Sequence, residues 1–248
     1  NEEEYPYLEE LLYWADNVYI FGFSGIPLEQ LNLLNIFQGR YEVIFNDLNK
    51  MLDILEEKRN TGEEEFKKVI LEDLGLIGYE LENYKLQNPG SKHHSILIKE
   101  KESKLSISQI LMSAGMYRAF SILVIINYYL MMKNPCTLII DDLGEGLDFD
   151  RSSKLTKLLF DKVKDSEIQL IVTSNDRFLM NAVDIKYLNV LDRKGHTVTS
   201  YNYENNRDTF EGFSFTGLNN FDFFALDFYK GEDNDENSFL CRRTDRED

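Results

Sequence analysis

"TLIIDDLGEGLD", residues 137–148, places two adjacent carboxylates directly after a short apolar stretch with the character of a strand. Like charges repel in surroundings of low dielectric, so Asp141 and Asp142 at such a position favour a bound cation. An acid at the end of a strand lies at the rim of a sheet, where it can hold Mg²⁺ beside the phosphates of a nucleotide. The alternative is that the acid pair only opens a turn before Gly144.

The segments around this stretch alternate between helix and strand. The pattern predicts a helix from Ser113, a strand over 137–141, a helix over 150–164 and a second strand over 168–173. A loop at 174–176, a short helix and a hairpin turning at Lys194-Gly195 follow. Such alternation indicates an α/β fold, whose ligands gather at the carboxyl ends of its strands.

The first hundred residues form a different pattern. We expect a helix over 5–15, a strand over 18–23 and a long helix over 28–60, either continuous or broken near Gly39. A charged turn at 60–65 then leads into a mixed region. Two strands are predicted around the turn at Asn88-Pro89-Gly90.

A second candidate site precedes the acid pair, in "SAGMYRAFSIL" (113–123). Ser113 is a good N-cap, Gly115 allows a backbone to come close to a ligand, and Arg118 lies in the first turns. The exposed N–H groups and positive dipole end of such a helix suit an anion. The alternative is a capped core helix with no ligand.

Composition excludes several classes of protein. The formal net charge is −17, from 27 basic and 44 acidic residues, which argues against gripping a nucleic-acid backbone. The two cysteines form no disulfide framework, so a reducing cytoplasm is expected. The cysteines and the three histidines also lack the spacing of a zinc site. The most apolar run, 119–132, is too short to span a bilayer and predicts a buried helix of a soluble protein.

Three segments, "SAGMYR", "TLIIDDLGEGLD" and "LIVTSND", resemble in order and spacing the C-terminal lobe of ABC-type ATPase heads. The resemblance is to the SMC and DNA-repair branch, and most closely to the OLD-like ATPases of prokaryotic antiphage defence. By motif it covers roughly residues 105–195. It implies ATP and Mg²⁺ as cofactors, and a homodimer or higher oligomer that forms through the heads. It also implies a protein effector, such as a nuclease or a toxin.

The resemblance also implies a role for each motif residue. Ser113 and Gly115 would belong to the signature motif, which contacts the γ-phosphate held by a second protomer. Arg118 and Asp148 would also bind the nucleotide. Asp141 would be the Walker B acid on the metal side. The other implied positions are the catalytic base (Asp142), the D-loop across the dimer interface (Gly146, Leu147, Asp148) and the switch after the last catalytic strand (Asn175).

Two residues depart from the family pattern. The family has Glu at the position of Asp142, and Asp is shorter by one CH₂, about 1.5 Å of reach. It has His at the position of Asn175, and an amide cannot carry a proton. Both departures predict slow hydrolysis.

A phosphate-binding loop is absent from the sequence, since no G-x-x-x-x-G-K-[ST] occurs in it. The Gly-Ser-Lys at 90–92 follows a proline turn rather than a strand. Because the chain starts "NEEEYPYLEE" without Met, we expect the lobe with this loop in a missing part of a longer polypeptide. A separately encoded lobe is the alternative. In both cases the piece alone should bind ATP poorly.

The sequence thus predicts an ABC-type ATPase C-terminal lobe, with the signature, Walker B, D-loop and switch over 105–230. A helical segment and strand pair over 1–104 would pack on it, and an acidic, disordered tail would occupy 231–248. The aromatic stretch 210–229, with eight Phe or Tyr among its twenty residues, is either a cover on the lobe's edge or a docking surface for an effector.

Two functions follow from this prediction. The first is an ATPase whose ATP-driven dimerisation controls a partner effector in antiphage defence or DNA transactions. The second is a non-hydrolysing, ATP-sensing scaffold that holds and releases an effector. A nuclease centred on Asp141 and Asp142 is disfavoured, because no third liganding acid lies at a suitable spacing and the negative charge opposes DNA.

Overall fold

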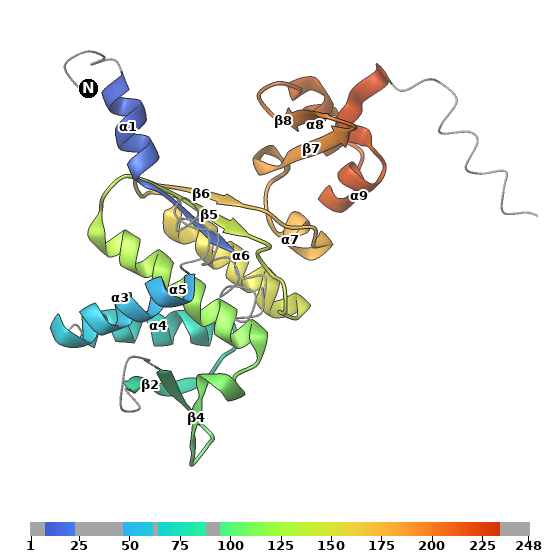
Figure 1. Cartoon of the computed structure of the whole chain (residues 1–248). Helices are drawn as coiled ribbons and strands as arrows, with labels where there is room; N and C mark the ends of the chain where they lie inside the picture. The colour runs from blue at the N-terminus through green and yellow to red at the C-terminus, as the bar shows by residue number, and fades with distance from the viewer. Residues whose placement is uncertain (1–7, 23–46, 62–63, 88–94, 234–248) are drawn as a thin grey trace, which may run out of the picture. The chain divides into compact units, whose positions relative to one another are not determined.

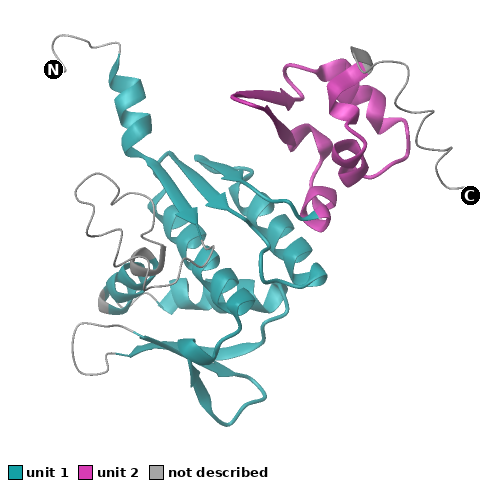
Figure 2. Cartoon of the chain, turned by 45° about the vertical axis from the view of Figure 1, so that its right-hand side comes forward, with its two compact units in different colours: residues 1–176 teal, residues 177–248 magenta. Residues whose placement is uncertain are grey.

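The computed structural model describes residues 8–22, 47–61, 64–87 and 95–233 of the 248-residue chain. The chain divides into two compact units, unit 1 (Asn1–Asp176) and unit 2 (Arg177–Asp248), shown in different colours in Figure 2. The division falls inside the segment 105–230 that the sequence predicts as one lobe.

A parallel sheet of three strands lies in unit 1. Its strands are β1 (Val18–Gly22), β5 (Cys136–Asp141) and β6 (Ile168–Val172), in the order β1-β5-β6. These strands confirm the three predicted from sequence, and the fold is α/β as expected. Gly22 at the end of β1 pairs with Asp141, so the carboxyl ends of the strands meet at one edge.

Two helices lie against one face of this sheet (Figure 1): α5 (Ala114–Met132) and α6 (Phe149–Val163). Helix α5 is buried at every position from Arg118 to Asn127, which confirms a buried helix within the predicted run 119–132; Met131 and Met132 at its end are exposed. It is the one described helix long and apolar enough to cross a membrane. Since 67% of its most apolar window is buried inside the fold, this composition is that of a core helix.

The opposite face of the sheet is only partly covered by the described residues. Ile20, Ile139 and Ile171 pair across the three strands and therefore point to the same side. Ile20 is 37% exposed and Ile171 42% exposed. Next to this row, the indole N–H of Trp14 in α1 (Glu9–Asp16) donates to the hydroxyl of Thr137 at 3.2 Å.

A second layer packs around α5. It contains α3 (Asp47–Thr61), α4 (Glu64–Leu76) and an antiparallel sheet of β2 (Leu81–Gln87), β3 (Ser95–Glu100) and β4 (Ser106–Ser108). The 3-10 turn η3 (Gln109–Leu111) then leads into α5. The predicted strand pair is confirmed. The predicted helix from residue 28 to 46 and the turn at 88–90 lie outside the described residues.

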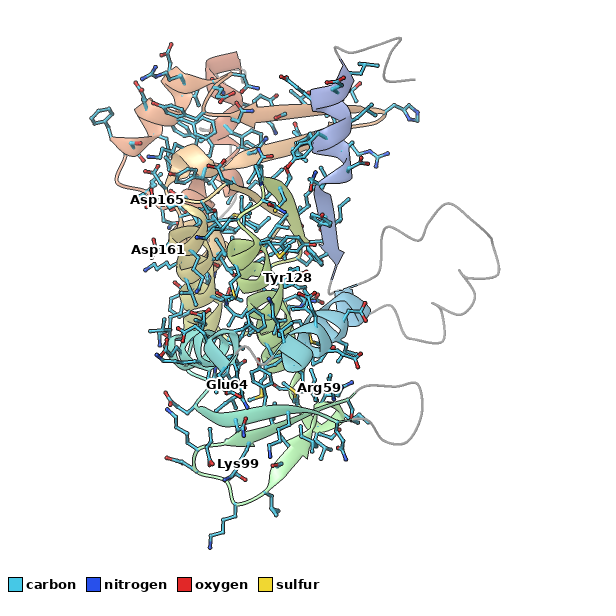
Figure 3. All side chains as sticks on the ribbon, turned by 90° about the vertical axis from the view of Figure 1, so that its left-hand side faces the viewer. Arg59, Glu64, Lys99, Tyr128, Asp161 and Asp165 are labelled. Carbon is cyan, nitrogen blue, oxygen red and sulfur yellow. The ribbon has the colours of Figure 1, made fainter. Side chains whose placement is uncertain are left out.

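Helix α4 differs from the charged turn and mixed region that the sequence predicts at these residues. The helix forms because Phe66, Ile70 and Leu74, spaced four residues apart, are all buried. Its many Lys and Glu residues mask this spacing in the sequence. The packing of α3 on α5 is visible beside Tyr128 (Figure 3), whose hydroxyl donates to Glu57 at 3.1 Å.

A buried polar cluster joins three helices of unit 1. Asn127 of α5 donates to the carboxylate of Asp73 in α4 at 2.6 Å. The Nζ of Lys162 in α6 lies 2.9 Å from the Asp73 carboxylate and also donates to Asn127 at 2.9 Å. The charge of Asp73 is therefore paired and hydrogen-bonded inside the core.

Unit 2 contains the predicted hairpin, β7 (Asn189–Lys194) and β8 (Thr197–Asn202). Its helices are α7 (Arg177–Ala182), α8 (Arg207–Ser214) and α9 (Asn220–Ala225), with 3-10 turns η4 (Ile185–Tyr187) and η5 (Phe228–Asp233). The aromatic stretch forms a core of its own within this unit; its buried members are Val190, Phe210, Phe213, Phe223 and Tyr229. Residues 234–248 of the predicted tail lie outside the described part of the chain.

Candidate functional site

The site begins at the N-terminus of α5. The hydroxyl oxygen of Ser113 accepts a hydrogen bond from the backbone N–H of Met116 at 3.1 Å, which confirms the predicted N-cap. Ser113 is exposed. Its side chain also interacts with Tyr79, whose pKa is raised because the ring is largely buried.

Gly115 is required by a close backbone contact. A Cβ at this position would lie 2.2 Å from the carbonyl oxygen of Gly146, which no side chain can occupy. The backbone that comes close to Gly115 is therefore that of the acid loop, which we define as residues 141–148. Contact of Gly115 with a nucleotide stays a prediction.

The acid loop starts at the carboxyl end of β5. Asp141 is exposed, and the hydroxyl of Thr173 donates to its carboxylate. Asp142 adopts a left-handed backbone conformation, with φ of 52°. Its N–H donates to the same Thr173 hydroxyl oxygen at 2.9 Å. The Thr173 hydroxyl thus bonds the side chain of one acid and the backbone of the other.

Arg118 lies under this loop and is only 6% exposed. One guanidinium nitrogen donates to the carbonyl oxygen of Asp142 at 2.7 Å, and another donates to the carboxylate of Glu145 at 2.7 Å. The structure therefore brings Arg118 and Asp142 together. Contact of Arg118 with a nucleotide is untested and stays a prediction.

A small pocket of about 180 Å³ lies beside the loop. Asp142 and Asn175, the predicted base and switch residues, both line it. They come from the ends of neighbouring strands β5 and β6, which explains why the fold brings them to one place. The remaining lining residues are Leu143, Gly144, Glu145, Ser174 and Asp176.

Asp148 ends the loop and caps α6. Its carboxylate accepts the backbone N–H of Arg151 at 3.0 Å and pairs with the Arg151 guanidinium. The backbone hydrogen bond, together with the guanidinium, lowers the pKa of Asp148. Arg151 also lies over the ring of Tyr79, 4.6 Å from its centroid.

These residues fit Mg²⁺ only in a limited way. Within the described ranges, no group of three or more His, Cys, Asp or Glu side chains is arranged to hold a metal ion. Mg²⁺ commonly takes one or two carboxylates, with phosphate and water oxygens as its other ligands. The exposed carboxylate of Asp141 can act as one such ligand, provided that a bound phosphate supplies others.

Four residues of the site were not predicted from sequence: Thr173, Glu145, Arg151 and Tyr79. Thr173 had a sequence signal, because it is a polar residue at the end of the predicted strand 168–173. Glu145 and Arg151 lie close to the acid pair in sequence, but charged residues near a turn are common and carry no signal. Tyr79 is distant in sequence, so only tertiary packing identifies it.

Sequence comparisons do not assign a family. No protein-family profile matches the chain, and no curated protein matches its sequence.

The solved structures with a similar fold include ATPase head domains of SMC proteins. One, an SMC ATPase described for ATP-driven dimerisation and DNA-stimulated activation, is 16% identical, with a TM-score of 0.46. That match covers 63% of this chain and 94% of the other. The SMC head of Pyrococcus furiosus with an extended coiled coil, bound to the C-terminal domain of ScpA, is 18% identical, with a TM-score of 0.46. The match covers 65% of this chain and 42% of that one.

The SMC head domain of Thermotoga maritima is 15% identical, with a TM-score of 0.38 over 60% of this chain and 51% of the other. The chain thus spans about half the length of the Pyrococcus furiosus and Thermotoga maritima heads. At these identities the likeness concerns the fold, and the roles of the site residues rest on their own geometry.

Proposed function

We propose that this chain is one lobe of an ATP-dependent head, in which ATP and Mg²⁺ bind between two copies. In this proposal the tip of α5, with Ser113 and Gly115, contacts the γ-phosphate held by a second copy. Asp141 is a magnesium ligand, and Asp142 orients the attacking water beside Asn175. Bound Mg²⁺ would neutralise charge on the phosphates.

One observation carries this proposal: the helix tip and the acid loop are in direct contact at the carboxyl edge of a parallel sheet. The backbones of Gly115 and Gly146 are in contact, and the Arg118 guanidinium donates a hydrogen bond to the carbonyl oxygen of Asp142 in the loop. Two motifs that are weak when taken separately are therefore parts of one surface. That surface combines helix N–H groups for an anion with an exposed carboxylate for a cation.

The partly exposed face of the parallel sheet is a reason to propose a second lobe that covers it. Parallel sheets normally have both faces covered, yet Ile20, Ile139 and Ile171 form an apolar row that the described residues leave half-exposed. Strand β6 pairs with β5 alone among the described strands, so its other edge is open to a further strand. We propose that the lobe with the phosphate-binding loop packs here, either from a longer polypeptide or from a separate one.

Exposed apolar side chains near the helix tip are a reason to propose that two copies of the chain assemble there. Ile110 and Leu111, just before Ser113, are 86% and 72% exposed, and Phe149, just after Asp148, is 58% exposed. Large apolar side chains of this kind are typical of the centre of a protein–protein interface. They flank both ends of the proposed nucleotide surface.

Phosphate release by the full-length or reassembled protein tests this function. Asp141→Ala is expected to lower the rate by about a hundredfold or more, because one metal ligand is lost. Asp161→Ala is the matched control, since Asp161 is an exposed acid on α6 (Figure 3) outside the site, and it should keep the wild-type rate. Equal rates for wild type and Asp141→Ala would contradict the proposal.

The second candidate is an ATP-sensing scaffold with little hydrolysis. It is favoured by the short Asp142 and the amide Asn175 in the same pocket, because neither residue matches a strong acid–base pair. In that case wild type and Asp141→Ala would both release almost no phosphate. ATP-dependent dimerisation, followed by light scattering, would still be lost in Asp141→Ala.

The effector is proposed on resemblance alone. We propose a cytoplasmic protein in which ATP-driven dimerisation controls a nuclease or a toxin. The exposed aromatic residues of unit 2, including Phe215 and Phe224, are available for such a contact. Co-purification of an effector with wild type, and its loss on Phe215→Ser, would test this step.

A further inference from the structure

Arg118 is a buried cation with unusual partners. It lies in the second turn of α5, and its guanidinium donates two hydrogen bonds to the acid loop, one to the carbonyl oxygen of Asp142 and one to the carboxylate of Glu145. A buried guanidinium is stable only when it is hydrogen-bonded and paired with a charge. The same contacts therefore stabilise both the buried Arg118 side chain and the conformation of the loop.

The loop backbone needs such support. Asp142, Gly144 and Gly146 all have positive φ, of 52°, 97° and 78°. The left-handed conformation is unfavourable for a residue with a side chain, so Asp142 holds it only with external contacts. Its carbonyl oxygen accepts both the Arg118 guanidinium and the backbone N–H of Glu145, at 3.2 Å. Arg118 therefore binds the loop at the point where its backbone reverses.

The tip of α5 and the loop are thus connected at two points. The first is the backbone contact between Gly115 and Gly146, and the second is Arg118, three residues further along the helix. A displacement of the helix tip is passed to the backbone of Asp142 and to Glu145. Both of these residues line the pocket with Asn175.

We propose that Arg118 is a positioning residue, which couples the position of the α5 tip to that of the Asp142 carboxylate. This role requires no contact of Arg118 with a ligand, whereas the family resemblance predicts a nucleotide contact for it. The effect of Arg118 on catalysis rests on the proposed function. The effect of Arg118 on the conformation of the acid loop does not depend on that function.

Hydrogen exchange of the full chain without nucleotide tests the structural part. In Arg118→Ala, the amides of Glu145 and Leu147, which bond within the loop, should exchange about tenfold faster or more, because both charge-assisted hydrogen bonds of the guanidinium to the loop are lost. Amides of the β2–β3 pair should exchange as in wild type. Arg118→Lys should be intermediate, because a single ammonium cannot reproduce the fork of two donors.

Unchanged loop exchange in Arg118→Ala would overturn the proposal, as would acceleration spread equally over the loop and β2–β3. If Arg118→Ala does not fold, Glu145→Gln is the second test, because Gln removes the charge of the exposed partner and keeps a hydrogen-bond acceptor for the buried guanidinium. That variant should accelerate exchange in the loop only, and no local acceleration would count against the role.

The assembled protein tests the catalytic part. Arg118→Lys should lower kcat at least about tenfold and leave the KM for ATP unchanged, since a positioning residue acts on the base rather than on binding. A raised KM with unchanged kcat would instead identify a nucleotide contact and overturn the role. If wild type itself releases no phosphate, the proposed function fails, while the exchange result still decides the hold of Arg118 on the loop.

Discussion

At the scale of single residues, Asp142 combines a demanding backbone position with a short side chain. Its left-handed φ of 52° is tolerated by Asp better than by Glu, while its reach into the pocket is less than that of Glu. The residue that fits the loop is therefore not the one that best orients a water. If Asp142 acts as the proposed function requires, this conflict is a physical reason to expect slow hydrolysis.

We expect Asp142→Glu to raise phosphate release by the assembled protein about tenfold or more, because the longer carboxylate is better placed as a general base. The same change should destabilise unit 1 by about 1 kcal/mol, because of the left-handed backbone. Single-turnover phosphate release and thermal unfolding measure the two effects. Asp142→Asn is the control and should show no increase. An unchanged or lower rate in Asp142→Glu would contradict the explanation.

Gly115→Ala tests the contact between helix tip and loop. Because the new Cβ would lie 2.2 Å from the Gly146 carbonyl oxygen, the loop must move, at a cost of about 2 kcal/mol or more. Gly75→Ala, in α4 of the same unit, has only Glu80 near its Cβ, at 3.9 Å. That control should keep or slightly raise stability. Denaturant unfolding of unit 1 compares the two, and equal stabilities would exclude the close contact.

At the scale of elements, the helices α4, α5 and α6 are connected through Asp73, Asn127 and Lys162. Asp73→Ala leaves the Lys162 charge without its buried partner, so the free energy of unfolding should fall by about 3–5 kcal/mol. Glu72→Ala, in the neighbouring exposed pair with Lys68, should change it by less than about 0.5 kcal/mol. Urea unfolding measures both, and similar values would show that the cluster is not a stabilising core pair.

The aromatic core of unit 2 gives a second test at this scale. Phe223 is fully buried among Phe210 and Phe213, so Phe223→Ala should cost about 3–5 kcal/mol and unfold unit 2 first. Phe224 is half-exposed, and Phe224→Ala should cost about 1 kcal/mol or less. Hydrogen exchange of the β7–β8 amides reports on this unit. A stable Phe223→Ala protein would contradict the assigned core.

At the scale of the whole molecule, the chain offers an acid loop and a helix tip but no phosphate-binding loop in its sequence. A helix tip and one metal acid give the triphosphate few contacts, so the isolated chain should bind ATP more weakly than micromolar. Calorimetric titration with Mg²⁺ and ATP measures this. Micromolar affinity of the 248-residue chain alone would show that the described site is complete without a second lobe.

The sequence by itself determined the central elements of the fold and the candidate acids. The apolar runs before Asp141 and Thr173 are long enough and sharply enough bounded to specify two strands, and Ser113 specifies the start of α5. These signals are local, because each depends on the properties of neighbouring residues. Helix α4 was missed because its buried residues are separated by charged ones.

Only the tertiary structure decided which residues act together. The contact of Gly115 with Gly146, the contacts of Arg118 with Asp142 and Glu145, and the Tyr79–Arg151 link join segments that are distant along the chain. Such contacts depend on how the helices pack on the sheet, and backbone conformations such as that of Asp142 depend on those contacts. A local sequence pattern contains no information on these contacts or backbone conformations. The acids could therefore be predicted from sequence, but the residues that hold them in place could not.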